Sequence, residues 1–371
     1  MVKVFLLCSG LGHVHRGYES FTRECYDALS SEKDLQITLF KGSGVASKGE
    51  VPLHCLKRRS SLAHFMAKWT KRDPYRLEQI TFTLLLLPYL LLMRPQVVYF
   101  SDEKIGTHLY QWRRISPFKF RLLFSNGAPL GPPYPLWDHV QQVAPLYYET
   151  ALAFGEPAQK QTLLPYGFEI SASLESLSTD EKREQRRARG LPQDRLVLLS
   201  VGALNKHHKR IDYLIREVAS LPGPRPFMVL LGQQEKDTNE LKALAEECLG
   251  AGNYLIRSVP HEQVAGYYKT ADFFVLASLN EGFGRVLVEA MSYGLPCLVH
   301  DYAVMRYVLS EQGHFGSFEQ EGGLAAALSK VLDDPAQIDK EAIHRFAYER
   351  YSWAKIRPRY AEMLRQSVRI S

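Results

Sequence analysis

The sequence of 371 residues has few cysteines, and their arrangement indicates neither a disulfide bridge nor a metal site. A disulfide framework needs an even set of cysteines, and a structural zinc site needs closely spaced ones. The cysteines here are odd in number, scattered among apolar residues, and form no Cys-x-x-Cys pair. They are Cys8, Cys25, Cys55, Cys248 and Cys297. We therefore expect reduced thiols in a cytoplasmic protein.

Long apolar segments are also scarce. The longest, residues 80–93, is shorter than the ~20 residues that span a bilayer and carries Pro88 in its middle, so no transmembrane helix is predicted. A basic cluster precedes it, made of Lys57, Arg58, Arg59, Lys68, Lys71 and Arg72. Two interpretations stay open. We favour a helix buried against a sheet behind a solvated basic entry; the alternative is a patch that rests on anionic lipid at the inner face of a membrane.

A strong excess of charge is absent as well. The formal net charge is only +6, and no basic stripe is interleaved with aromatic residues, so nucleic acid is not needed as a partner. The apolar share of 46% is typical of a soluble globular protein with a sizeable core. The length suits two domains of roughly 150 to 200 residues each.

Strand-like and helix-like patterns alternate in two series along the chain. The first series, residues 1–170, opens with VKVFLLCSG, which we interpret as a buried strand and not as a signal peptide. Residues 171–195 are polar and rich in charge, and we predict a linker with a solvated helix. The second series, residues 196–350, is the more regular. Such alternation predicts an α/β fold with two doubly wound, Rossmann-like parallel sheets, whose ligands bind beyond the carboxyl ends of the strands.

The stretch SLNEGFGRVLVEAMSYGLP, residues 278–296, places Glu281 and Glu289 on either side of a Gly-Phe-Gly turn. A helix should begin near Gly284, and its first backbone N–H groups would face an anion of diphosphate size. Glu289 lies roughly 7 Å along this helix, so it could bind the vicinal hydroxyls of a ribose; the alternative is a surface pair with Arg285. Glu281 could bind sugar hydroxyls, or it could be a carboxylate held by the helix dipole.

This motif resembles the Glu-x7-Glu signature of retaining glycosyltransferases of family 4, which are GT-B enzymes with two Rossmann-like domains and an interdomain cleft. The resemblance covers essentially the whole chain, strongly over residues 196–310 and weakly elsewhere. Further segments fall in the family's order: GHVHRGYESF, LLPYGFE, LLSVGALNKHHKRIDYLI and YERYSWAKIRPRYAEML. The last one looks like the helix, about residues 351–371, that crosses back to the N-terminal domain.

The resemblance implies a role for each domain and for several residues. The N-terminal domain with the crossing helix would bind the acceptor, and the C-terminal domain would bind a nucleoside diphosphate sugar. Glu281 would orient the donor sugar, Glu289 would bind the ribose, and Lys209 would hold the diphosphate. The remaining donor-binding positions would be Gly17, Gly202, Arg210, Gly282, Phe283, Gly284, Arg285 and Val286.

Two positions depart from the family pattern. Ala203 stands where many members have a phosphate-binding arginine, and the same loop offers Lys206, His207, His208 and Arg210 as substitutes. Asn126 stands where relatives often have a histidine near the donor sugar, and we assign it a catalytic contact. The loop after it is rich in proline and aromatic residues, which suggests a rigid wall beside the acceptor. The candidate acceptor-side residues are His15, Trp137 and His139.

The sequence contains no Asp-x-Asp, the usual carrier of a metal–diphosphate in the other large glycosyltransferase architecture. We therefore expect transfer of a hexose without a metal or cofactor, to a glycan, a lipid-linked sugar or a small molecule. Lys209 and helix N-terminal amides would stabilise the leaving diphosphate. Two alternatives remain: a nucleotide-sugar epimerase using His13, His15 and Glu19, and an inactive nucleotide-sugar-binding protein, which Ala203 and Asn126 motivate.

Overall fold

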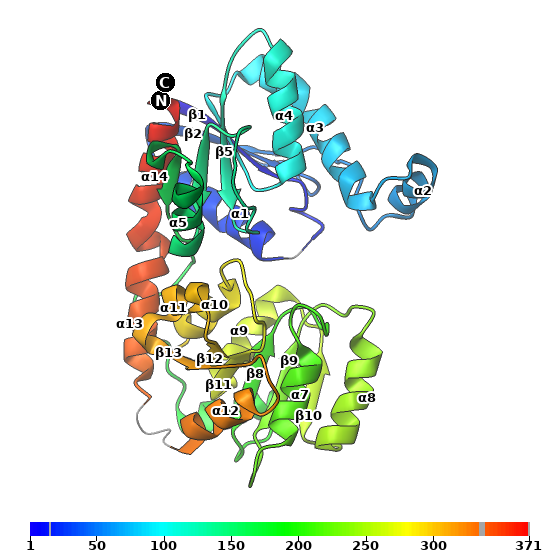
Figure 1. The fold of residues 1–371 in the computed structure, drawn as a ribbon, viewed down its shortest axis with the longest axis vertical. Coiled ribbons are helices and arrows are strands. Elements are labelled where there is room, and N and C mark those ends of the chain that lie inside the picture. Colours follow the sequence, from blue (N-terminus) through cyan, green and yellow to red (C-terminus); the bar gives the residue numbers. More distant parts are fainter. Residues whose placement is uncertain (15, 334–337, 370–371) are drawn as a thin grey trace. The chain divides into compact units, whose positions relative to one another are not determined.

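The computed structural model describes residues 1–14, 16–333 and 338–369. The chain divides into two compact units, and each is described by itself (Figure 1). The N-terminal unit combines Met1–Glu169 with Trp353–Ser371, and the C-terminal unit is Ile170–Ser352. The end of the chain thus belongs to the same unit as its beginning.

The N-terminal unit is built on a sheet of seven parallel strands within the described residues, in the order β3-β2-β1-β4-β5-β6-β7. The strands are β1 (Val2–Cys8), β2 (Leu35–Lys41), β3 (Glu50–Pro52), β4 (Val97–Phe100), β5 (Arg121–Asn126), β6 (His139–Gln142) and β7 (Gln161–Leu163). All four residues of β4 are buried, as expected for a parallel strand with both faces covered. The strand order reverses between β1 and β4, which makes their carboxyl ends the topological switch point of this sheet.

Helices cover both faces of the N-terminal sheet, and Figure 1 shows α14 on one side with α3 and α4 on the other. The helices are α1 (Gly17–Leu29), α2 (Ser61–Thr70), α3 (Pro74–Met93), α4 (Glu103–Ile115), α5 (Pro145–Phe154), the short η1 (Ala158–Lys160) and α14 (Trp353–Arg369). Buried Tyr360 fixes α14 to the unit, because its hydroxyl donates to the Pro165 carbonyl at 2.8 Å and accepts from Gln141 Nε2.

Helix α3 is longer than the apolar run alone predicted. It begins at Pro74, capped by the Asp73 carboxylate, and its 20 residues would suffice by length and composition to cross a membrane. One face of the helix, with Phe82, Leu86 and Leu90, is nevertheless buried in the core of the unit. A mostly buried core helix can pass the same test of length and composition, whereas 39% of the apolar window of α3 is buried.

The C-terminal unit has a second parallel sheet, with six strands in the part of the chain that is described, in the order β10-β9-β8-β11-β12-β13. This is the 3-2-1-4-5-6 order of a Rossmann domain, with its switch point between β8 and β11. The strands are β8 (Val197–Val201), β9 (Phe227–Leu231), β10 (Tyr254–Arg257), β11 (Phe273–Leu276), β12 (Cys297–His300) and β13 (Gly313–Gly316).

The helices of this unit follow its strands and form a core with them. They are α6 (Thr179–Ala188), α7 (Ile211–Ala219), α8 (Thr238–Leu249), α9 (His261–Thr270), α10 (Arg285–Ser292), α11 (Ala303–Leu309), η2 (Ser310–Gln312), α12 (Gly323–Asp333) and α13 (Lys340–Tyr351). Helix α6 is largely exposed, as expected of a solvated helix, but one side of it is fixed to the unit. Lys182 and buried Arg186 bind the Asp272 carboxylate at 2.7 and 2.6 Å, which docks α6 onto the unit.

Candidate functional site

Two loops meet at the switch point of the C-terminal sheet. Strands β8 and β11 are neighbours, and the loops after them, residues 202–210 and 277–284, leave from the same edge of the sheet. Lys209 Nζ and Glu281 Oε1 join the two loops at 2.5 Å, with side chains only 14% and 10% exposed. The structure thus brings the predicted phosphate-binding lysine and the predicted sugar-binding glutamate into one largely buried ion pair.

The side chain of Lys209 reaches Glu281 by lying across Gly202. A Cβ added at Gly202 would be 3.0 Å from Lys209 Cε and 3.2 Å from Cδ, which is tighter than ordinary contact. The loop itself is fixed by Asn205, whose Oδ1 accepts hydrogen bonds from the backbone N–H groups of His208 and Lys209 at 3.0 and 2.9 Å. The absence of a side chain at Gly202 therefore leaves room for the side chain of Lys209. From the sequence, Gly202 was predicted only to bind the donor.

Arg210, predicted to help hold the diphosphate, has hydrogen bonds within the C-terminal unit. Its guanidinium donates to the Phe318 carbonyl at 2.7 Å and lies over the Tyr213 ring at 4.0 Å. A longer bond of 3.4 Å to the Ala277 carbonyl connects it with the loop after β11. The side chain thus also holds the two loops together, and its contact with a diphosphate stays a prediction.

Another substitute for the missing arginine is also engaged elsewhere. The Lys206 ammonium pairs with Glu240, and its backbone N–H donates to Asp237 at 3.1 Å. His207 and His208 are exposed. Within the described part of the chain, Lys209 is therefore the lysine of this loop that forms an ion pair with a residue of the Glu-x7-Glu motif.

The turn after Glu281 leads into α10, whose start agrees with the sequence-based prediction. Gly284 is the N-cap residue, with a φ of 77° in the left-handed region that favours glycine. Phe283 is buried, with its ring edge against Tyr351 at 5.9 Å, so it anchors the turn through its side chain. The first N–H groups of a helix point beyond its end and attract anions, so this terminus can receive a phosphate through the backbone of residues 284–286.

Glu289 lies one turn further along α10 and has a partner that the sequence did not reveal. The hydroxyl of Tyr268, on α9, donates to Glu289 Oε2 at 3.2 Å. Burial, and then the negative charge of Glu289, raise the pKa of Tyr268 well above its ordinary value, so the phenol keeps its proton and remains a donor. Arg285 is buried at 8% exposure and is no ordinary surface residue.

Asn126, predicted to make a catalytic contact, has its side chain hydrogen-bonded inside the N-terminal unit. Its side chain is fully buried in the N-terminal unit, where Oδ1 accepts from the Leu130 N–H at 2.6 Å. Its Nδ2 donates to the Leu130 carbonyl at 3.1 Å and to Gln142 Oε1 at 2.9 Å. Both ends of the amide are thus used to close the loop after β5, which is a structural role, and the catalytic contact of Asn126 stays a prediction.

Two of the predicted acceptor-side residues, Trp137 and His139, are buried. The Trp137 ring is buried among Phe100 and Phe124 at centroid distances of 5.4 and 5.5 Å. His139 is buried on β6 and hydrogen-bonded to Thr162 Oγ1 at 2.7 Å, and burial lowers its pKa to about 4. Both side chains stabilise the interior of the N-terminal unit. His15 lies outside the described residues, and Gly17 is the exposed first residue of α1.

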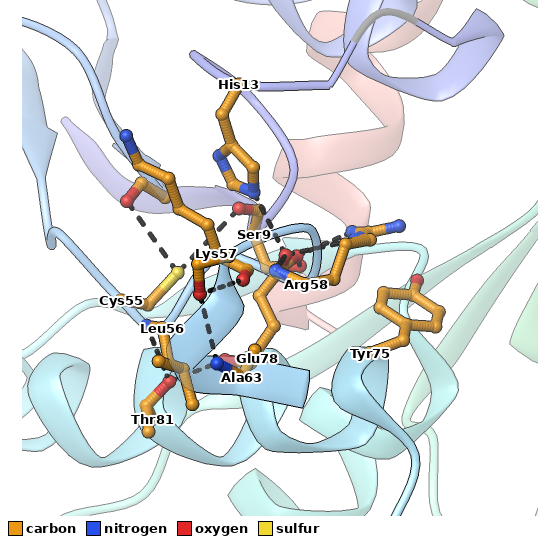
Figure 2. A network of polar contacts seen from close by, with 12 residues as sticks. Ser9, His13, Cys55, Leu56, Lys57, Arg58, Ala63, Tyr75, Glu78 and Thr81 are labelled. Carbon is orange, nitrogen blue, oxygen red and sulfur yellow. Dashed lines mark hydrogen bonds and ion pairs between the residues drawn. The ribbon is translucent and has the colours of Figure 1, made fainter. Parts of the chain in front are cut away.

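A polar network that sequence reasoning missed occupies the switch point of the N-terminal sheet. Figure 2 shows the buried Glu78 carboxylate between Ser9, His13 and Arg58. Glu78 accepts from Ser9 Oγ at 3.0 Å, from Arg58 Nε at 2.9 Å and lies 2.9 Å from His13 Nε2. Burial opposes its ionisation, but the hydrogen bonds from His13 and Arg58 outweigh burial and lower its pKa to about 2. Arg58 therefore belongs to this network and not to the solvated basic cluster.

Comparison with known proteins identifies the C-terminal unit. Residues 181–352 match the family described as glycosyl transferases group 1. D-inositol 3-phosphate glycosyltransferase 2 of Catenulispora acidiphila is 26% identical over 230 residues, which are 57% of this chain and 52% of that protein. The GDP-mannose:cellobiosyl-diphosphopolyprenol alpha-mannosyltransferase of Xanthomonas campestris is 31% identical over 174 residues, 45% of this chain and 46% of that protein. The chain spans about half the length of these curated relatives.

Solved structures match the whole chain in fold. Sucrose-phosphate synthase from Thermosynechococcus elongatus superposes with a TM-score of 0.79 at 18% identity and covers 100% of both chains. HepE from Anabaena, solved with UDP and glucose, gives 0.76 at 15% identity over 98% of this chain and 100% of that one. The architecture is therefore GT-B, with two Rossmann-like units. The match of residues 181–352 to the glycosyl transferases group 1 family agrees with the resemblance of the motif to family 4.

Proposed function

We propose that the protein is a retaining, metal-independent glycosyltransferase that moves a hexose from a nucleoside diphosphate sugar to a carbohydrate, lipid-linked or small-molecule acceptor. The observation that carries this proposal is the Lys209–Glu281 ion pair at the switch point of the C-terminal sheet, next to the start of α10. Its support from relatives is that curated group 1 proteins are named for glycosyl transfer and that HepE binds UDP and glucose.

The proposed chemistry assigns each group a separate task. The bond between the anomeric carbon and the diphosphate oxygen breaks, and the acceptor oxygen bonds to that carbon on the same face of the sugar. The acceptor proton passes to the leaving phosphate, so no enzymatic base is required. The Lys209 ammonium and the α10 N-terminus stabilise the charge that develops on the diphosphate. Glu281 accepts hydrogen bonds from the sugar, and Glu289 accepts them from the ribose.

Metal independence belongs to the same proposal. It rests on the absence of an Asp-x-Asp from the sequence and on the presence of Lys209 where cationic stabilisation is required. No cofactor is part of the proposed reaction. We place the protein in the cytoplasm, because its sequence has the cysteine pattern of a reduced compartment.

A nucleotide-sugar-binding protein without turnover is the second candidate. It is favoured by Ala203 and by the commitment of the Arg210 guanidinium to backbone carbonyls, because both leave the diphosphate with fewer cations than many relatives have. An epimerase is less favoured, since His13, which it would use as an acid or base, is bound to Glu78 and largely buried.

A donor-and-acceptor screen tests the proposal. The protein is incubated with a panel of nucleotide sugars and candidate acceptors, while released nucleoside diphosphate and glycosylated products are followed by mass spectrometry and the anomeric configuration of the product is determined by NMR. Release of diphosphate together with a new glycoside of unchanged anomeric configuration is the expected result. Absence of release from every donor would overturn it, and binding of donor without release would select the second candidate. Epimers formed without any acceptor would select the isomerase.

Mutation of the two glutamates of the motif is expected to affect different properties, turnover in one case and nucleotide binding in the other. Glu281→Ala should lower turnover at least about tenfold, which is ~1.4 kcal/mol or more, with nearly unchanged affinity for nucleoside diphosphate, because it contacts the sugar. Glu289→Ala should instead weaken nucleotide binding, because it contacts the ribose. Steady-state kinetics and calorimetric titration with the diphosphate measure both effects. Glu262→Ala, an exposed carboxylate on α9, is the control. Identical behaviour of the two variants would contradict this division of roles.

A further inference from the structure

Helix α2 turns its apolar side outward. Leu62, Phe65 and Trp69 recur at i, i+3 and i+7, which places them on one face of the helix. They are exposed by 58%, 71% and 83%, whereas Ala63 on the opposite side is fully buried. The helix therefore has the reverse orientation of an ordinary amphipathic helix, whose apolar face covers a core. Figure 1 shows α2 at the outer end of the N-terminal unit, away from its sheet.

The neighbouring helix α3, against which α2 packs, also leaves an apolar stripe uncovered. Its inner face is buried in the core, but its outer face has exposed residues at the helical spacing i, i+1, i+4, i+7 and i+8. These residues are Leu84, Leu85, Pro88, Leu91 and Leu92. Two adjacent helices thus expose apolar faces for which the N-terminal unit supplies no cover in the described residues.

The charge around α2 is strongly one-sided. Six exposed cations lie in or beside the helix, against one exposed carboxylate, Asp73. The cations are Lys57, Arg59, Lys68, Lys71, Arg72 and Arg76. Exposed apolar side chains flanked by lysine and arginine are the chemistry that lies at the boundary of an anionic bilayer. A second copy of this chain is a poor occupant, because a twofold contact would bring the two basic rims together.

The surface is held firmly on its unit. Arg58 lies in the segment that leads into α2, and it binds Glu78, near the start of α3, through its side chain and through its backbone N–H at 2.8 Å. The Arg58 guanidinium also stacks on Tyr75, at 3.8 Å from the ring centroid. Since this network also includes Ser9 after β1, it fixes α2 and α3 to the carboxyl ends of the strands where a doubly wound unit binds its ligand.

We propose that the outer face of α2, with its flanking cations, docks the N-terminal unit on an anionic lipid bilayer. Phe65 and Trp69 enter the interface, and the lysines and arginines contact the lipid phosphates. This inference goes beyond the proposed function and does not depend on it. If the protein both transfers a sugar and docks on a membrane, it encounters its acceptor at the membrane surface, which favours an acceptor carried by a lipid.

Vesicle binding by the full chain tests the proposal. Sedimentation with vesicles of phosphatidylcholine alone is compared with vesicles that also contain phosphatidylglycerol, at low and high salt. We expect binding to the anionic vesicles, weakened by salt, together with a blue shift of tryptophan emission. Trp137 and Trp353 are buried and Trp112 is half-buried, so the shift should come from Trp69 and disappear in Trp69→Phe. Absence of binding, or equal binding to both vesicles, would overturn the proposal.

Matched variants separate docking from folding. Phe65→Ser with Trp69→Ser, and separately Lys68→Glu with Lys71→Glu, should each lower the vesicle partition coefficient at least about tenfold. Ile115→Ser with Phe154→Ser, which alters exposed apolar residues elsewhere on the same unit, should leave it unchanged. Transfer to a soluble acceptor should be the same in all three, so a failure of docking is distinguishable from a failure of the proposed function. A dimer in sedimentation velocity that Phe65→Ser with Trp69→Ser dissolves would also overturn the proposal.

Discussion

Replacing Lys209 with alanine is expected to lower the turnover number for sugar transfer by about 100- to 1000-fold, the loss typical when one preorganised donor to a developing negative charge is removed. Lys209 is the cation that the structure holds against the Glu-x7-Glu motif, at 2.5 Å from Glu281. Its environment is largely closed to water, where a charge acts more strongly than at the surface. Steady-state kinetics with a nucleotide sugar, and calorimetric titration with the matching diphosphate, measure the effect.

Lys206→Ala is the matched control for this experiment. It removes an ammonium from the same loop, but that ammonium pairs with Glu240, an exposed residue. Its turnover should stay close to that of the unaltered protein, because an exposed ion pair contributes little. The double variant Lys209→Ala with Glu281→Ala should lose less than the product of the two single losses, since the residues act as one unit. A turnover of Lys209→Ala within a few-fold of Lys206→Ala would contradict the proposed role.

The contact between Lys209 and Glu281 shows what sequence reasoning can reach. The residues are 72 positions apart, and no local pattern relates them. Each residue follows a predicted parallel strand, however. Since ligands of such sheets bind beyond the carboxyl ends of the strands, both residues were expected at the same edge of the sheet. The family resemblance added the chemistry. The pair was therefore predictable in kind, although the passage of the lysine chain across Gly202 was not.

Two predicted site residues, Arg210 and Asn126, have hydrogen bonds within the fold that the sequence did not reveal. Arg210 stands in a loop full of cations, and a sequence shows its charge but not the Phe318 carbonyl, 108 positions away, that accepts its hydrogen bond. Asn126 likewise has its amide used within its own unit. A polar residue next to a motif looks like a ligand-binding residue in the sequence. The sequence does not show whether its hydrogen-bonding groups are already used within the fold.

Helices α2 and α3 show a second limit. Periodicity predicts that a helix has an apolar face, but it does not tell whether the protein covers that face. The start of α3 had a recognisable signal, since Asp73 and Pro74 are a good N-cap and first residue, yet the apolar run drew the prediction to residue 80. The buried pair of Arg58 and Glu78 had none, because ion pairs between distant segments leave no pattern in a sequence.

Replacing Arg58 with methionine is expected to destabilise the N-terminal unit by about 3–5 kcal/mol at neutral pH, the range for leaving one partner of a buried ion pair alone. Glu78 is fully buried, and burial by itself disfavours its charge. In the unaltered protein the hydrogen bonds from His13 and Arg58 outweigh burial and hold its pKa at about 2. Without the guanidinium, the buried Glu78 must remain charged with only Ser9, His13 and the backbone N–H of residue 58 as partners, or take up a proton. Urea unfolding followed by fluorescence measures the loss.

The pH dependence distinguishes this mechanism from a simple loss of packing. A carboxylate with a lowered native pKa contributes stability that is present above its unfolded value, near 4.3, and is lost as the pH falls toward 2. The deficit of Arg58→Met should therefore shrink as the pH falls below about 4, because the unaltered protein then loses what the variant already lacks. Adding Glu78→Leu should recover much of the stability at pH 7, since an apolar pair can replace a buried ion pair at little cost. Arg59→Met, next in sequence and exposed, is the control. A deficit that is the same at pH 7 and at about pH 2.5 would mean that Arg58 acts through its packing on Tyr75, and not through the charge of Glu78.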